Sequence, residues 1–131
     1  MRNDAEVTAL PRAFPPDPMD ALCPSRQVLD LIADKWSVLV IAAIGRGADR
    51  NGSLLRTIGG ISQKSLTRSL RNLERNGLVT RHDFHELPPR VEYRLSELGH
   101  SLQPVFSVMC QRAVESMPHV VAAQRRHDLG R

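Results

Sequence analysis

The sequence predicts a mainly α-helical domain with one small β-hairpin, and three observations support this fold class. Apolar residues recur at helical spacing along most of the chain from residue 25 onward. Two short runs rich in β-forming residues, 78–84 and 91–95, flank the rigid segment Leu87-Pro88-Pro89. Glycine-containing pairs separate the helical segments, as short connections require. The length of 131 residues suits a single domain.

The first part of the chain changes character near residue 20. Residues 1–20 contain four prolines and no apolar period, so we expect a flexible N-terminal arm. Residues 25–33 then carry an amphipathic helical stripe, and residues 36–44 are apolar nearly all round, as in a buried central helix. A buried strand remains the alternative for the second segment, since Val40-Ile41 suits one.

The middle of the chain predicts two consecutive helices joined by a tight turn. Residues 53–58 form a short helix, and Gly59-Gly60 makes the turn. Ser62 is a good N-cap for the longer helix that follows, in which Leu66, Leu70 and Leu73 share one face. Asn76-Gly77 supplies its left-handed stop.

This order of elements is that of a winged helix-turn-helix domain, which we place at residues 21–95, with the hairpin as the wing. Ser96 caps a last helix with an apolar face, which we place at 96–118 and expect to be a dimerisation helix. We expect residues 119–131 to be a flexible tail.

The helix from Ser62 to Asn76 has a basic face opposite its leucines. A projection at 100° per residue gathers four cations there, and only Glu74 opposes them, near the core edge. Side chains of the first turn would point at base edges in a major groove, with Arg68 behind them, while Arg71 and Arg75 would meet phosphates. Arg90, after Pro88-Pro89, would reach phosphates from the wing. The predicted DNA-binding residues are Ser62, Gln63, Lys64, Ser65, Thr67, Arg68, Arg71, Arg75 and Arg90.

Composition narrows the function classes. The net charge of +4 and the isoelectric point near 9.8 suit an anionic partner, and nearly all the positive charge is arginine. No apolar run is long enough to span a membrane, and we expect a cytoplasmic protein. No nucleophile–base pair, phosphate loop or zinc spacing is present, so the sequence predicts neither an enzyme nor a metal or cofactor site. A winged-helix protein-interaction module that does not bind DNA remains the alternative.

Several motifs together resemble the HxlR-type winged helix-turn-helix regulators, and the resemblance runs from about Cys23 to Leu102. It implies a homodimeric bacterial regulator in which the N- and C-terminal helices supply the dimer contacts, and which binds an inverted repeat near a promoter. Two departures are Asn51, where the family usually has an aromatic residue, and Gly59, which replaces a customary proline. The matching motifs are Cys23-Pro24, Leu29-Asp30-Leu31-Ile32, Lys35-Trp36, Gly60-Ile61-Ser62, Leu66-Thr67, Leu70-Arg71-Asn72-Leu73-Glu74, Gly77-Leu78-Val79 and Pro88-Pro89-Arg90-Val91-Glu92-Tyr93.

Two cysteines bear on the regulatory signal. Cys23 comes just before the first helix, where a helix N-terminus and the nearby Arg26 favour a reactive thiolate. The resemblance implies the same, because some members of the family sense oxidants or electrophiles through a thiol at this position. The alternative is that Cys23 is an inert packing residue and that the regulator responds to a small-molecule ligand instead of an oxidant. Cys110 lies beside the apolar face of the last helix and is more typical of a core or interface residue.

Overall fold

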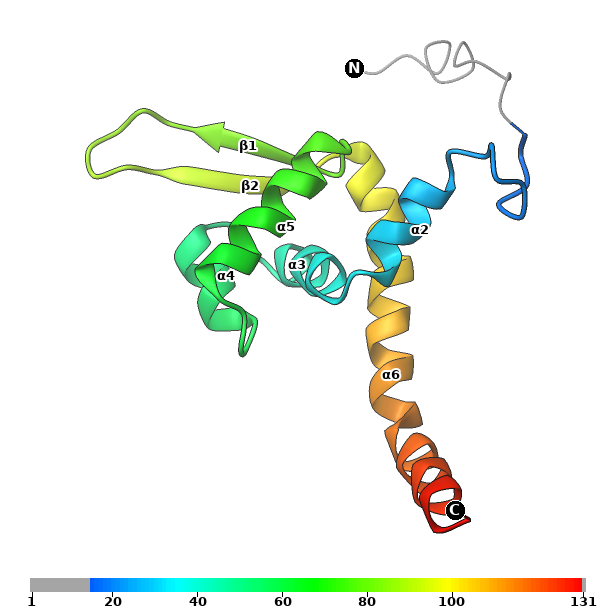
Figure 1. The fold of residues 1–131 in the computed structure, drawn as a ribbon. Helices are drawn as coiled ribbons and strands as arrows, with labels where there is room; N and C mark the ends of the chain where they lie inside the picture. The colour runs from blue at the N-terminus through cyan, green and yellow to red at the C-terminus, as the bar shows by residue number, and fades with distance from the viewer. Residues whose placement is uncertain (1–14, 131) are drawn as a thin grey trace.

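A computed structural model describes residues 15–130 of the chain (Figure 1). The expected N-terminal arm falls largely on residues 1–14, which lie outside the described residues, and residues 15–20 contain no helix or strand. The fold is mainly helical with one hairpin, which confirms the predicted fold class. Its elements are α2 (Arg26–Ala33), α3 (Lys35–Gly45), α4 (Asn51–Thr57), α5 (Gln63–Arg75), β1 (Val79–Asp83), β2 (Val91–Leu95) and α6 (Glu97–Leu129).

The central element is α3, which packs against α2, α4, α5, α6 and β2. Its residues Val40 and Ile41 are fully buried, and their β-branched side chains made a strand the alternative for this segment. The structure settles it as a helix, because tertiary burial on several sides outweighs a weak local propensity. Asp34 begins the helix: its carboxylate accepts hydrogen bonds from the Ser37 amide at 3.1 Å and the Ser37 hydroxyl at 2.6 Å.

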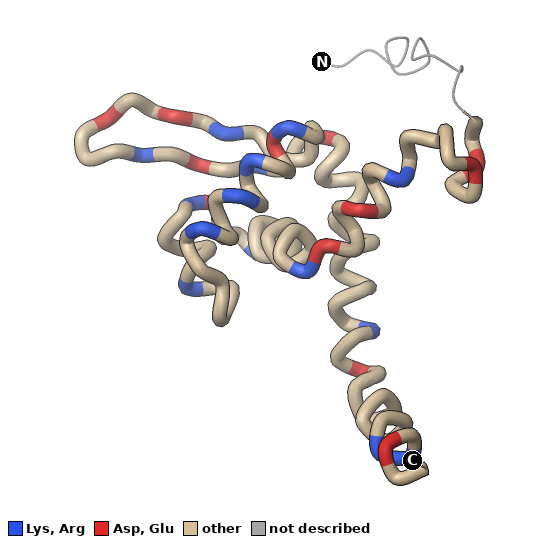
Figure 2. Tube along the Cα trace, viewed as in Figure 1, with Lys and Arg blue, Asp and Glu red and all other residues tan. Residues whose placement is uncertain are grey.

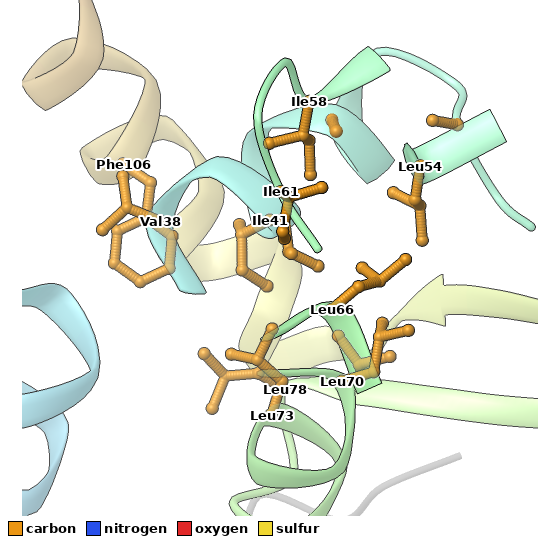
Figure 3. Close-up of a cluster of buried hydrophobic side chains, with 14 of the residues drawn as sticks. Val38, Ile41, Leu54, Ile58, Ile61, Leu66, Leu70, Leu73, Leu78 and Phe106 are labelled. Atoms are coloured by element: carbon orange, nitrogen blue, oxygen red, sulfur yellow. The ribbon is translucent and has the colours of Figure 1, made fainter. Parts of the chain in front are cut away.

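One hydrophobic core joins the helix-turn-helix to the rest of the molecule (Figure 3). Leu66, Leu70 and Leu73 of α5 are buried in it, as their spacing predicted, next to Ile41 of α3. Phe106 is fully buried and brings α6 into the same core. The position of α5 is therefore fixed by side chains on one face only, which leaves its opposite face free.

The hairpin extends away from this core as a wing (Figure 1). β1 and β2 are antiparallel, with Val79 opposite Leu95 at the base. Two backbone hydrogen bonds tie the hairpin to the chain around it: the Ser96 amide donates to the Leu78 carbonyl at 3.0 Å next to the base, and the Tyr93 amide in the middle of β2 donates to the Asp49 carbonyl at 2.7 Å. The wing therefore has a fixed root and an exposed tip.

The last helix corrects the expected boundary at residue 118. Helix α6 continues through Pro118 to Leu129, so the prediction of a flexible tail from residue 119 was wrong. The segment beyond Pro118 is free of glycine until Gly130, and Arg126 and His127 in the last turn interact favourably with the helix C-terminus. At about 1.5 Å per residue the helix is about 50 Å long, and it projects far from the domain (Figure 1). None of the helices in the described part of the chain could span a membrane.

Candidate nucleic-acid interface

The turn between α4 and α5 orients the second helix. Ile58 and Ile61 are buried on either side of the turn, so both helices are anchored close to it. Gly60 has a φ of +82°, a conformation in which a β-carbon is strained. The Ser62 hydroxyl accepts a hydrogen bond from the Ser65 amide at 3.0 Å, which confirms the predicted N-cap.

The outward face of α5 carries unpaired positive charge. Lys64, Arg68, Arg71 and Arg75 are all exposed, and basic residues follow one another along this helix (Figure 2). Within residues 15–130, none of these four side chains forms an ion pair. The carboxylates that form ion pairs there do so with other basic side chains. The structure thus brings together the four cations that the sequence placed on one face.

Gln63, the first residue of α5, is less free than the sequence indicated. Its side-chain amide forms a reciprocal pair with Asn51 at the start of α4: Asn51 Nδ2 donates to Gln63 Oε1 at 2.7 Å, and Gln63 Nε2 donates to Asn51 Oδ1 at 2.8 Å. Gln63 Nε2 also donates to Thr67 Oγ1 at 3.0 Å. Asn51 is therefore a residue of this surface that the sequence analysis missed. There it was noted only as a departure from the family pattern.

Arg90 in the wing is held by intramolecular partners. Its guanidinium donates to Glu92 Oε2 through Nε at 3.0 Å and Nη2 at 2.7 Å, and it lies 4.2 Å from the centre of the Phe84 ring. Arg94 and Arg50 approach the same carboxylate at 3.2 Å and 3.7 Å. These hydrogen bonds lower the pKa of Glu92 and raise that of Arg90. A DNA contact by Arg90 stays a prediction, and this surface of the wing carries far less free positive charge than α5.

Cys23 is more enclosed than a free sensor thiol at a helix end. The side chain is 5% exposed, and its Sγ lies 2.8 Å from the Ser25 hydroxyl. Arg26, expected to favour the thiolate, instead donates to the carbonyl oxygens of Pro18 and Met19 at 2.8 Å and 3.0 Å. Both cysteines are free thiols in this structure. Among residues 15–130, no group of three His, Cys, Asp or Glu side chains is placed to hold a metal ion.

A cavity of about 540 Å³ opens between α3, the turn after α4, and α6. This volume lies in the range of small-molecule sites, roughly 300–1,000 Å³. The thiol-bearing Cys110 of α6 is among the lining residues, and Lys35 and Arg46 at the two ends of α3 are its charged ones. Apolar lining residues include Ile32, Val38, Leu39, Ile58, Met109 and Val114.

Several known proteins are similar to this chain in sequence. A regulator from Synechocystis, described as HTH-type, is 44% identical over 88 residues, which cover 67% of this chain and 65% of that protein. YtfH of Escherichia coli, also described as an HTH-type transcriptional regulator, is 36% identical over 102 residues, 78% of this chain and 81% of the relative.

Solved structures with this fold include proteins described by their redox state. YtfH from Salmonella typhimurium has a TM-score of 0.76 at 33% identity and covers 83% of this chain and 97% of its own. The redox regulator HypR in its oxidised form has a TM-score of 0.64 at 35% identity, with coverages of 71% and 96%. Diamide-treated YodB from Bacillus subtilis has a TM-score of 0.61 at 35% identity, with coverages of 73% and 96%.

The family model described as HxlR-like helix-turn-helix matches residues 31–120, which include both helices of the helix-turn-helix, the wing and most of α6. This match confirms the resemblance noted from the motifs. The chain therefore belongs to the HxlR-like helix-turn-helix family of transcriptional regulators.

Proposed function

We propose that this chain is a transcriptional regulator, and not an enzyme, that binds double-stranded DNA as a homodimer through α5. The observation that carries the proposal is the row of four cations on the face of α5 opposite its leucine anchor, none of which forms an ion pair within residues 15–130. A helix fixed on one face and basic on the other fits a major groove, whose phosphates attract the cations and whose base edges the first turn reaches.

The residues of α5 divide by their position along the helix. Ser62, Lys64 and Ser65 stand in or next to the first turn, where side chains reach base edges, and Arg68 lies one turn further on the same face. Arg71 and Arg75 stand in the later turns and contact phosphates. Arginine forms two parallel hydrogen bonds to a guanine edge, so we assign sequence preference to Arg68 and salt-dependent affinity to the later pair.

The homodimer is supported by the exposed apolar side chains of α6. Only Gly99 and Phe106 of this helix are buried, although it carries many large apolar side chains. Exposed large apolar side chains along a helix mark an association site, and a two-fold dimer presents its two α5 helices to successive major grooves of an inverted repeat. The exposed apolar residues of α6 include Leu98, Val105, Val108, Met109, Val114, Met117 and Val120.

Binding to the DNA upstream of the chain's own gene tests the DNA proposal. Fluorescence anisotropy with a labelled duplex, titrated over salt, should give affinity that falls steeply as salt rises. No binding at low salt would refute it and would favour the protein-interaction alternative.

Sedimentation tests the dimer. Val105→Lys places a charge on the exposed apolar face of α6 and should shift the protein toward monomer, whereas Gln111→Lys adds the same charge at a polar position and should not. A monomeric parent protein, or equal effects of the two substitutions, would refute an α6-mediated dimer.

For the regulatory signal we propose oxidation at Cys23, supported by the likeness to HypR and to diamide-treated YodB. Diamide takes two electrons and two protons from a pair of thiols, so Cys23 needs a second thiol, supplied by a partner subunit or a small molecule. Cys23→Ser should abolish the effect of diamide on DNA affinity, and Cys110→Ser shows whether the second thiol is Cys110. An unchanged response of Cys23→Ser would make Cys23 inert and leave the cavity beside Cys110 as the effector site.

A further inference from the structure

The amide pair between Asn51 and Gln63 occupies one particular edge of Gln63. A side-chain amide has an edge on which its oxygen accepts and its nitrogen donates side by side. Gln63 presents this edge to Asn51, at 2.7 Å through Oε1 and 2.8 Å through Nε2. The second N–H of Gln63 Nε2 points to Thr67 Oγ1 at 3.0 Å. Both donors of Gln63 are therefore in use, and one lone pair of Oε1 is left.

The same edge is the one with which glutamine reads adenine. In the major groove adenine offers an N6 donor beside an N7 acceptor, and glutamine binds both through its oxygen and nitrogen. The Asn51 amide presents the same combination, a donor beside an acceptor. Asn51 and an adenine are therefore alternative partners for one edge of Gln63, and both cannot be bound there together.

We propose that Asn51 is a specificity-determining residue that closes the adenine-reading edge of Gln63. This inference rests on the proposed function, because it requires α5 to enter a major groove. With Asn51 in place, Gln63 contributes little preference for adenine at the base pair that it faces. Without Asn51, the edge opens and an adenine preference appears at that position.

The Asn51–Gln63 pair and a glutamine–adenine contact have similar free energies, so Asn51 can change the base preference of Gln63. Both residues are exposed, so each hydrogen bond of the pair contributes only its net value in water. Two such bonds, at about 0.5–1.5 kcal/mol each, correspond to roughly a 5- to 150-fold population of the closed pair. A bidentate contact discriminates for adenine by about the same factor, roughly 5- to 150-fold. Opening the pair thus cancels most of what the adenine contact would gain.

Selection from a randomised duplex library tests the proposal, with the full-length parent protein beside its variants. Asn51→Ala should gain roughly a 5- to 150-fold preference for adenine at one position of each half-site, and Asn51→Ala/Gln63→Ala should lose that gain. Gln63→Ala alone should gain no adenine preference at this position. Thr67→Val, which removes a partner of Gln63 without exposing its paired edge, is the matched control and should gain no adenine preference at this position.

Two results would overturn the proposal while leaving the proposed function intact. In one, Asn51→Ala selects the same sequences as the parent. In the other, Gln63→Ala and Asn51→Ala each lose one base preference that the parent has, which would mean that Asn51 positions Gln63 for reading. Failure of the parent to enrich any sequence would instead refute the proposed function. Alanine favours helices, so Asn51→Ala should fold, and its unfolding midpoint checks this.

Discussion

The unpaired cations of α5 allow the orientation of this helix on DNA to be tested by charge removal. Arg71→Gln and Arg75→Gln each remove one guanidinium that, within the described residues, has no carboxylate partner. The matched control is Arg112→Gln, which lowers the net charge equally but lies on α6, a helix that packs mainly on α3. A local phosphate contact and a general effect of net charge therefore predict different results.

The magnitude follows from counting released counterions. Each phosphate contact contributes about 0.9 to the slope of log affinity against log salt, and a homodimer carries each substitution twice. Arg71→Gln should therefore reduce the slope by about 1.8. Relative to 1 M salt, where this contribution vanishes, the corresponding loss of affinity at 0.15 M salt is roughly 30-fold. Arg112→Gln should change the slope by much less.

Anisotropy titrations of one labelled duplex between about 0.05 and 0.3 M salt measure these slopes directly, over the range in which counterion release is large. An equal loss of slope in Arg112→Gln would show that only net charge matters. Unchanged slopes in both α5 variants would refute the placement of Arg71 and Arg75 at the phosphate backbone, and with it the orientation of the helix.

Three further substitutions test the fold that supports this surface. Glu92→Gln should destabilise the domain at neutral pH. Because the pKa of Glu92 is held below its ordinary 4.5, the difference from the parent in urea midpoints should shrink as pH falls below that value. Phe106→Ala should lower the free energy of unfolding by about 3–5 kcal/mol in urea titrations, and a loss under 1 kcal/mol would mean that α6 is not anchored there. Gly60→Ala should cost about 1–2 kcal/mol because its φ is +82°, whereas Gly59→Ala should not, and equal losses would contradict the strained turn.

The elements that sequence predicted well are those defined by local rules. Leu66, Leu70 and Leu73 are buried because a helical period of 3.6 residues places them on one face, whatever they pack against. The Ser62 cap and the positive φ of Gly77 likewise depend on residues a few positions away. The central helix needed more than local rules, since burial of Val40 and Ile41 on all sides decided between helix and strand.

The features that sequence missed depend on contacts between distant segments. Asn51 and Gln63 are twelve positions apart and meet only because the turn at Gly60 folds α4 back against α5. A projection of α5 alone shows Gln63 as a free side chain, since the wheel contains no residue of α4. The end of α6 was missed for a different reason: the helix was expected to end at residue 118, although it continues through Pro118 and the residues after it sustain a helix.

The sequence alone does not show that the arginines of α5 and of the wing differ in their ion-pair partners. Arg71 and Arg90 look alike in the sequence, yet Arg90 shares Glu92 with two other arginines, while Arg71 has no carboxylate partner among the described residues. A guanidinium already bound to a carboxylate offers less attraction to phosphate, because part of its field is neutralised. The cations of α5 should therefore contribute more electrostatic affinity for DNA than Arg90 of the wing does.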